Sequence, residues 1–178
     1  MSNVPNPPVS IASVMQNKIM TIDNLKRMIA VWRIHGSKKI VFTNGCFDLL
    51  HPGHLHVIHE AKSLGGILIV GVNTDSSVKD IKPGRPIQDE NSRAIILASL
   101  EAVDAVILFG EETPLELIKQ LQPDVIVKGG DYKPEEVVGK EVTDANGGKV
   151  EIIALLENFS TTGIIKKMEN RKSNTSST

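Results

Sequence analysis

The sequence predicts a single α/β domain built on a doubly wound, five-stranded parallel sheet with helices on both faces. Its 178 residues suffice for one hydrophobic core without disulfides or metals. Five short apolar segments alternate with amphipathic stretches along the chain. These segments are largely apolar throughout instead of alternating with polar residues, which is typical of parallel strands covered on both faces. Such an arrangement is Rossmann-like.

The first half of the chain is expected to supply two strands and two helices. Apolar residues fall on one helical face between Ile22 and Trp32, with Thr21 as N-cap, and could pack on the chain's own sheet or on a second subunit. A strand is expected at 39–42. A helix should run from Pro52 to about Leu64, because proline suits the first helical turn. The strand at 67–73 follows.

In the second half, two sequence patterns indicate helix starts. Asn91 is a candidate N-cap for a helix over 91–103. Residues 113–116 have the form of a capping box with proline at the first helical position, so a helix should continue to about Leu121. A last helix begins at Thr161 or Thr162. The strands of this half are expected at 105–109, 124–128 and 149–155.

Both ends of the chain have the composition of disordered segments. Residues 1–16 carry three prolines among small and polar residues, and residues 171–178 are polar and of low complexity. The folded domain is therefore expected at 17–170. No signal peptide is visible and no apolar stretch reaches 18 residues, so we expect a cytoplasmic protein without a membrane span.

The overall composition excludes several classes of function. Lys and Arg number 20 against 21 Asp and Glu, so the net charge is −1 and no general basic field for nucleic acid exists. Six aromatic residues leave little for stacking bases. The single cysteine excludes an intramolecular disulfide and zinc patterns that need paired cysteines.

The most informative segment is a group of histidines directly after the first strand. His51 and His54 flank Pro52-Gly53 at a strand-to-helix turn, where free backbone N–H groups and the helix dipole favour an anion. Both imidazoles can donate to phosphate oxygens. His56 and His59 are expected to be ordinary solvated or core histidines. A zinc site made of all four lacks an Asp, Glu or Cys ligand at a familiar spacing.

The residues around this turn carry a family resemblance. The pattern T-x-G-x-F-D-x-x-H-x-G-H at 43–54 resembles the signature of the nucleotidylyltransferase superfamily. Further segments extend the resemblance, namely G-R-P at 84–86, V-K-G-G-D-Y at 127–132 and S-T-T-G-I-I-K-K-M at 160–168. With these segments in order, the chain resembles the D-glycero-β-D-manno-heptose 1-phosphate adenylyltransferases from about Lys18 to Met168.

The resemblance implies a reaction and its partners. ATP and the heptose 1-phosphate would give ADP-heptose and pyrophosphate by direct in-line attack, and the product would feed the inner core of lipopolysaccharide. Mg²⁺ would be carried by the nucleotide, with no direct side-chain ligand. Many relatives fuse this domain behind a sugar kinase, so a chain of this length implies separate kinase and phosphatase chains. Relatives are often dimers, which favours a homodimer.

The resemblance also implies roles for individual residues. His51 and His54 are the catalytic pair, which would contact the α- and β-phosphates. The nucleotide-binding candidates are Asn44, Gly45, Cys46, Phe47, Gly53, Lys128, Gly129, Asp131, Ser160, Thr161 and Thr162. The phosphate- or sugar-binding candidates are Asp48, Lys82, Arg85 and Arg93.

Two of these candidates carry open questions at the sequence level. Asp48 could orient a histidine, cap the turn or serve structure alone. Lys82 begins the segment Lys82-Pro83-Gly84-Arg85-Pro86, which is one residue shorter than the K-G-P-x-R-P common in relatives.

Several alternatives stay open as well. The chain could be a cytidylyltransferase or another adenylyltransferase acting on a different phosphorylated small molecule. It could also be a nucleotide-binding regulator without catalysis, or a metal module that uses the histidines. Cys46 is not needed as a nucleophile, because a sugar phosphate oxygen is already ionised at neutral pH.

Overall fold

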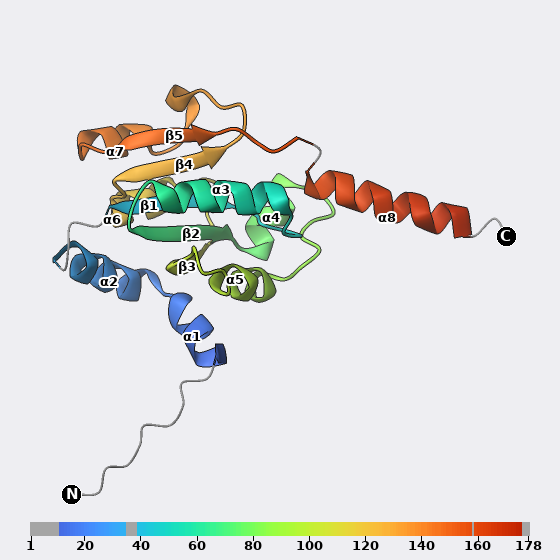
Figure 1. Cartoon of the computed structure of the whole chain (residues 1–178), viewed down its shortest axis with the longest axis horizontal. Helices are drawn as coiled ribbons and strands as arrows, with labels where there is room; N and C mark the ends of the chain where they lie inside the picture. Colours follow the sequence, from blue (N-terminus) through green and yellow to red (C-terminus); the bar gives the residue numbers. More distant parts are fainter. Residues whose placement is uncertain (1–10, 35–38, 158, 176–178) are drawn as a thin grey trace, which may run out of the picture.

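The central feature is one sheet of five parallel strands. The computed structural model describes residues 11–34, 39–157 and 159–175. The strand order is β3-β2-β1-β4-β5, so the direction of winding reverses between β1 and β4 (Figure 1). This confirms the predicted doubly wound sheet. The strands are β1 (Ile40–Gly45), β2 (Ile67–Asn73), β3 (Ala105–Phe109), β4 (Val125–Gly129) and β5 (Lys149–Ile153).

Helices connect the strands and cover both faces of the sheet. α3 follows β1, α5 precedes β3 and α6 follows β3, as the sequence predicts. The shorter α4, α7 and η1 were not expected, because each has too few residues to show a helical period. The helices are α1 (Ile11–Lys18), α2 (Ile22–Ile34), α3 (Pro52–Ser63), α4 (Asp75–Ile81), α5 (Glu90–Ala98), α6 (Leu115–Leu121), η1 (Pro134–Glu136), α7 (Lys140–Ala145) and α8 (Thr161–Thr175).

Successive residues of β1 point to two separate hydrophobic clusters. Val41 belongs to the cluster that contains Ile58 of α3 and Leu97 of α5. Phe42 belongs to the other cluster, with Ile118 of α6 and residues of α2. All five of these side chains are fully buried. The strands are apolar throughout because each face needs its own core.

The amphipathic helix at the N-terminal side packs on the chain's own sheet. Leu25 and Ile29 of α2 are buried, and Trp32 packs against the same cluster. Thr21 Oγ1 accepts a hydrogen bond from Asn24 N at 3.4 Å, so the predicted N-cap is confirmed. This helix face is therefore not free for a second subunit.

Two predicted helix starts are wrong. The cap of α5 is Asp89, whose carboxylate accepts from Asn91 N and Ser92 N, so Asn91 lies inside the helix. α5 also ends at Ala98 and not at residue 103. At α6 the expected capping box does not form, because the helix begins after Pro114, which has no side-chain acceptor.

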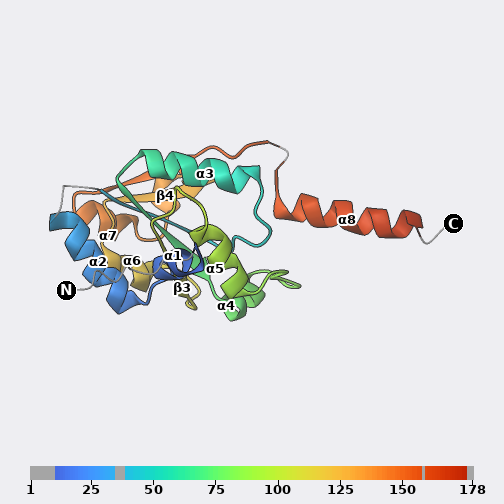
Figure 2. The same cartoon turned by 60° about the horizontal axis from the view of Figure 1, so that its bottom comes forward.

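The ends of the chain are more helical than their composition predicts. Residues 11–16, expected to be disordered, belong to α1, which packs against α5. The last helix begins at Thr161 as expected and continues to Thr175, past the predicted limit at residue 170. In both views α8 extends away from the sheet (Figures 1 and 2). Disorder was also predicted for residues 1–10 and 176–178, which lie outside the residues that the structure describes.

Candidate active site

A cavity of about 620 Å³ lies at the carboxyl edge of the sheet and extends across the switch point between β1 and β4. This is where doubly wound sheets bind ligands. Fifteen of the seventeen candidate residues line it, which shows that the expected residues converge on one site. They are Asn44, Gly45, Cys46, Phe47, Asp48, His51, Gly53, His54, Lys82, Arg85, Lys128, Gly129, Ser160, Thr161 and Thr162.

The two catalytic candidates stand together at the start of α3. His51 is the N-cap residue in extended conformation, and Pro52 occupies the first helical turn, as predicted. The imidazoles of His51 and His54 stack, with ring centroids 3.8 Å apart and planes inclined by 22°. Their Nδ1 atoms are buried and have no hydrogen-bond partner within the protein. Two unpaired imidazole nitrogens at a helix N-terminus form a phosphate-binding arrangement.

Burial also sets the charge of these histidines. Desolvation lowers the pKa of His51 below its usual value. Desolvation, together with repulsion from His51 and Lys82, lowers the pKa of His54 to about 4. Both rings are therefore neutral at pH 7 in the free protein. A bound phosphate would reverse this effect, because a nearby negative charge favours the imidazolium.

A partly buried lysine lies at the same edge of the sheet. Lys128, near the end of β4, donates from Nζ to Asn44 Oδ1 of β1 at 2.6 Å. Burial lowers the pKa of Lys128 to about 8. Its hydrogen-bond partner is a neutral amide, so the ammonium lacks a neighbouring carboxylate. A partly buried cation that lines the cavity is a candidate for binding an anionic ligand.

The structure answers the question left open for Asp48. Its carboxylate accepts from Arg85 Nη1 at 2.7 Å and from the backbone N–H groups of Ile87 and Gln88 at 2.9 and 3.0 Å. Although burial opposes it, these hydrogen bonds hold the pKa of Asp48 below its usual value. The partners of Asp48 are thus the loop before α5 and not a histidine. Lys82 still lines the cavity despite the shortened segment.

Two candidates lie elsewhere. Arg93 is 1% exposed and lies beneath the cavity. All three of its guanidinium nitrogens donate hydrogen bonds to oxygen atoms of the protein, so the expected ligand contact is not supported. Asp131 is exposed and does not line the cavity, although Tyr132 beside it does. The sequence could not distinguish these cases, because both residues lie in segments that reach the correct edge of the sheet.

Other lining residues had no predicted role in the site. Thr43 precedes the histidine turn, and Glu112, Thr113 and Pro114 come from the loop after β3. The rule that ligands bind beyond the carboxyl ends of the strands already pointed to that loop. The capping-box pattern at 113–116 predicted a helix start there and not a ligand contact. Phe159 also lines the cavity, next to the candidate residues at the start of α8.

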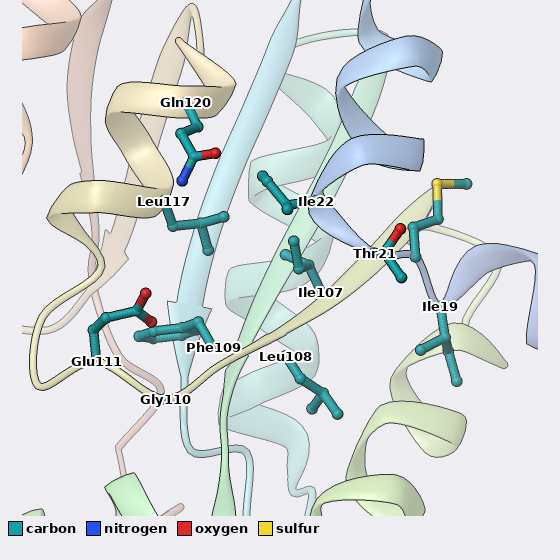
Figure 3. A pocket seen from close by; sticks show the side chains of 11 residues that line it. Ile19, Thr21, Ile22, Ile107, Leu108, Phe109, Gly110, Glu111, Leu117 and Gln120 are labelled. Carbon is teal, nitrogen blue, oxygen red and sulfur yellow. The ribbon is translucent and has the colours of Figure 1, made fainter.

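A second cavity, of about 490 Å³, differs in chemistry. It lies beside β3, between the start of α2 and α6. Figure 3 shows Ile22, Ile107 and Leu117 turned toward it, with Glu111 at one end. No histidine or basic side chain lines it, so it does not suit a phosphate.

Together, a Rossmann-like sheet, a histidine pair at a helix N-terminus and nearby cations define an enzyme that acts on nucleotide phosphates, a nucleotidyltransferase. The particular family follows from sequence comparison. A family model described as cytidylyltransferase-like matches residues 42–178, so the chain belongs to that family.

Individual relatives agree with this assignment. The chain is 49% identical over 167 residues to the bifunctional protein HldE of Nitrobacter hamburgensis, and this alignment covers 93% of this chain and 34% of that protein. It is 51% identical over 152 residues to the bifunctional protein HldE of Geobacter metallireducens, and this alignment covers 85% of this chain and 31% of that protein. The chain thus spans about a third of the length of these relatives.

Solved structures support the fold. A lipopolysaccharide core biosynthesis protein from Thermoplasma volcanium is 34% identical, with a TM-score of 0.56 over 68% of this chain and 99% of that one. A pantoate-beta-alanine ligase from Francisella tularensis has a TM-score of 0.55 at 16% identity over 82% of this chain and 74% of that one, and therefore bears on the fold alone. Among the residues that the structure describes, no helix has the length and apolar character to cross a membrane.

Proposed function

We propose that this protein transfers the AMP group of ATP to D-glycero-β-D-manno-heptose 1-phosphate, giving ADP-heptose and pyrophosphate. The stacked pair His51 and His54, with both Nδ1 atoms buried and unpaired, is the observation that carries the proposal. The heptose phosphate is supported by the motif resemblance over about 18–168. It is further supported by a structural relative whose title concerns lipopolysaccharide core biosynthesis.

The chemistry needs no general base. An ionised oxygen of the sugar phosphate attacks the α-phosphorus of ATP, forming a new phosphorus–oxygen bond. The bond from the α-phosphorus to the bridging oxygen breaks in line, and pyrophosphate leaves. Catalysis then consists of bringing two anions together and stabilising the charge that develops in transfer. His51, His54 and Lys128 contribute nitrogen donors for these phosphate oxygens.

The side chains of the cavity fit a nucleotide that brings its own Mg²⁺. They include the nitrogen donors of His51, His54 and Lys128, and among the described residues no group of three or more His, Cys, Asp or Glu side chains could hold a metal ion. The one carboxylate nearest the turn, Asp48, is engaged by Arg85 and the loop backbone. Mg²⁺ bound to the triphosphate would offset phosphate charge, and this chain's residues would bind the remaining oxygens.

A cytidylyltransferase reaction is the second candidate, because the matching family is described as cytidylyltransferase-like. It would use the same histidine turn and the same in-line displacement with CTP. Catalysis with a different phosphorylated small molecule would also preserve the site. A nucleotide-binding regulator would not need two imidazoles at the reacting phosphate.

Pyrophosphate release tests these candidates directly. Purified protein with Mg²⁺ and the heptose 1-phosphate is given ATP, CTP, GTP or UTP in turn, and release with ATP alone is expected. His51→Ala and His54→Ala should lower kcat by about 100-fold or more while nucleotide binding largely remains. His59→Ala is the matched control, since His59 lies on the same helix, exposed and away from the cavity. Equal rates in the three variants would reject the histidine roles.

The proposal extends to the cellular setting. The protein would act in the cytoplasm, on a substrate supplied by kinase and phosphatase reactions, and as a homodimer. Analytical ultracentrifugation of the purified protein tests the last point.

A further inference from the structure

The backbone that leads into the histidine turn is held in an unfavourable conformation. Phe47 has φ of 47° and Leu49 has φ of 46°, which is the left-handed region that large side chains rarely adopt. Such a conformation persists only where surrounding contacts over-determine it. The contacts that hold this turn therefore also determine where His51 and His54 stand.

The first of these contacts comes from a buried arginine on α5. Arg93 Nη1 donates to the carbonyl oxygen of Cys46, the residue immediately before Phe47, at 2.5 Å. Arg93 Nη2 donates to the carbonyl oxygen of Asn73 at 2.8 Å and to Asp75 Oδ1 at 2.8 Å. One guanidinium thus joins the end of β1 to the end of β2. Only a planar, multidentate donor can reach these acceptors together.

A second contact closes the arrangement from the other side. Arg93 Nε donates to the carbonyl oxygen of Gln88 at 3.0 Å, and Gln88 N donates to Asp48 Oδ1 at 3.0 Å. Asp48 lies between the two left-handed residues and is 4% exposed. Gln88 is therefore linked to Arg93 and Asp48, so the turn is held at both Cys46 and Asp48. We call these three residues, Arg93, Gln88 and Asp48, the turn clamp.

We propose that Arg93 is a positioning residue for the transfer reaction, which acts by holding Cys46 and the left-handed turn in the form that sets His51 and His54 against the phosphates. This inference rests on the proposed function. Arg93 touches no ligand, because its side chain has no exposed surface. A purely structural role would instead make Arg93 one more contributor to folding stability, with no particular effect on the histidines.

The test compares three variants that separate these roles. Arg93→Met removes every donor while keeping an unbranched side chain. Arg93→Lys keeps the charge but cannot bridge the same acceptors. Leu97→Ala is the matched control, because Leu97 lies one turn further along α5, is fully buried and has no side-chain donor for the backbone of the turn. Leu97→Ala should lower Tm at least as much as the arginine variants do.

The kinetic result should divide the variants. Misplacement of reacting groups by about 1 Å costs roughly 100-fold in rate, so Arg93→Met and Arg93→Lys should lose about that factor in kcat. Their KM for the nucleotide should change less than about threefold, since the cavity donors remain. Leu97→Ala should keep kcat within about twofold below its Tm. Equal kcat losses in the arginine and leucine variants would overturn the proposal.

A spectroscopic readout decides the point even if the proposed reaction is wrong. The imidazole of His54 is followed by NMR during a pH titration, with its signal assigned from His54→Gln. In the wild type and in Leu97→Ala its titration should be centred near pH 4. In the arginine variants the ring should gain water and titrate closer to pH 6.5. An unchanged His54 titration in both arginine variants would overturn the positioning role. If Arg93→Met does not fold, the titration of His54 in Arg93→Lys alone tests that role.

Discussion

Lys128 Nζ donates a hydrogen bond to Asn44 Oδ1 at 2.6 Å and thereby joins β4 to β1 across the switch point of the sheet. The two residues are 84 positions apart in the chain. Another cation of the cavity, Arg85, is paired with Asp48, whereas the partner of Lys128 is neutral. Lys128 therefore has charge available for an anionic ligand.

We expect nucleotide binding to protonate Lys128. Its pKa of about 8 means that a large share of the protein carries a neutral amine at pH 8, and a bound triphosphate raises that pKa. ATP binding at pH 8 should take up a fraction of a proton, measured by calorimetry in buffers of different ionisation enthalpy. Lys128→Arg keeps the charge but should abolish this uptake, and Lys128→Met should weaken binding by about 10-fold or more. Full uptake in Lys128→Arg would assign the proton to another group.

The lowered pKa of His54 should make stability depend on pH. Its folded value of about 4 lies below the unfolded value of 6.5, so the stability is complete above pH 6.5 and declines as pH falls from 6.5 toward 4. Between pH 7 and 5 the contribution is about 1 kcal/mol after allowance for partial exposure. Urea unfolding at both pH values should show a smaller decline in His54→Gln than in the wild type. The exposed His59→Gln should retain the wild-type decline.

The end of β4 packs too tightly against α3 for any side chain at Gly129. A Cβ there would lie 2.6 Å from Val57 Cγ2 and 3.1 Å from Leu155 Cδ2. Gly129→Ala should therefore cost about 1–3 kcal/mol of unfolding free energy and weaken ATP binding, because the cavity wall must shift. Gly110→Ala is the control, since a Cβ there meets its nearest atom at an ordinary 3.4 Å. Thermal unfolding and ATP titration of both variants check this, and equal Tm values would contradict it.

The start of α8 depends on Ser160. Its Oγ accepts a hydrogen bond from Gly163 N at 3.0 Å and so caps the first turn of the helix. Ser160→Ala should cost about 1 kcal/mol of local helix stability, or about fivefold faster amide exchange at 163–166. Ser63→Ala, at the far end of α3, should leave exchange in α8 unchanged. Hydrogen exchange measured by mass spectrometry distinguishes them, and equal rates at 163–166 in wild type and Ser160→Ala would show that this cap is dispensable.

Local patterns were sufficient where short-range forces decide the structure. The apolar strand segments, the proline in the first turn of α3 and the cap at Thr21 all appear as predicted. The caps of α5 and α6 were wrong because several polar residues stood near each helix start. Asp and Asn are about equally good caps, so the pattern could not choose between Asp89 and Asn91 two positions later.

The interaction partners of charged residues were the feature that the sequence predicted least well. Arg85, Arg93 and Asp48 belong to segments at the same edge of the sheet, and the sequence suggested ligand contacts for each. The structure instead uses Arg93 and Asp48 to hold the histidine turn. The role of a charged residue in a loop becomes clear only when its partners are known. Apart from the bond between Arg93 and Gln88, five positions apart, these partners lie 18 to 47 positions away from Arg93 or Asp48.

The sequence by itself therefore determined the class of fold, the edge of the sheet that carries the chemistry and the histidine pair. These follow from hydrophobic patterning and from residues adjacent in the chain. Tertiary structure alone decided the strand order, the Asn44–Lys128 contact and the burial of Arg93 beneath the turn. Each of these depends on which distant segments become neighbours, and that is set by packing two cores on one sheet at once.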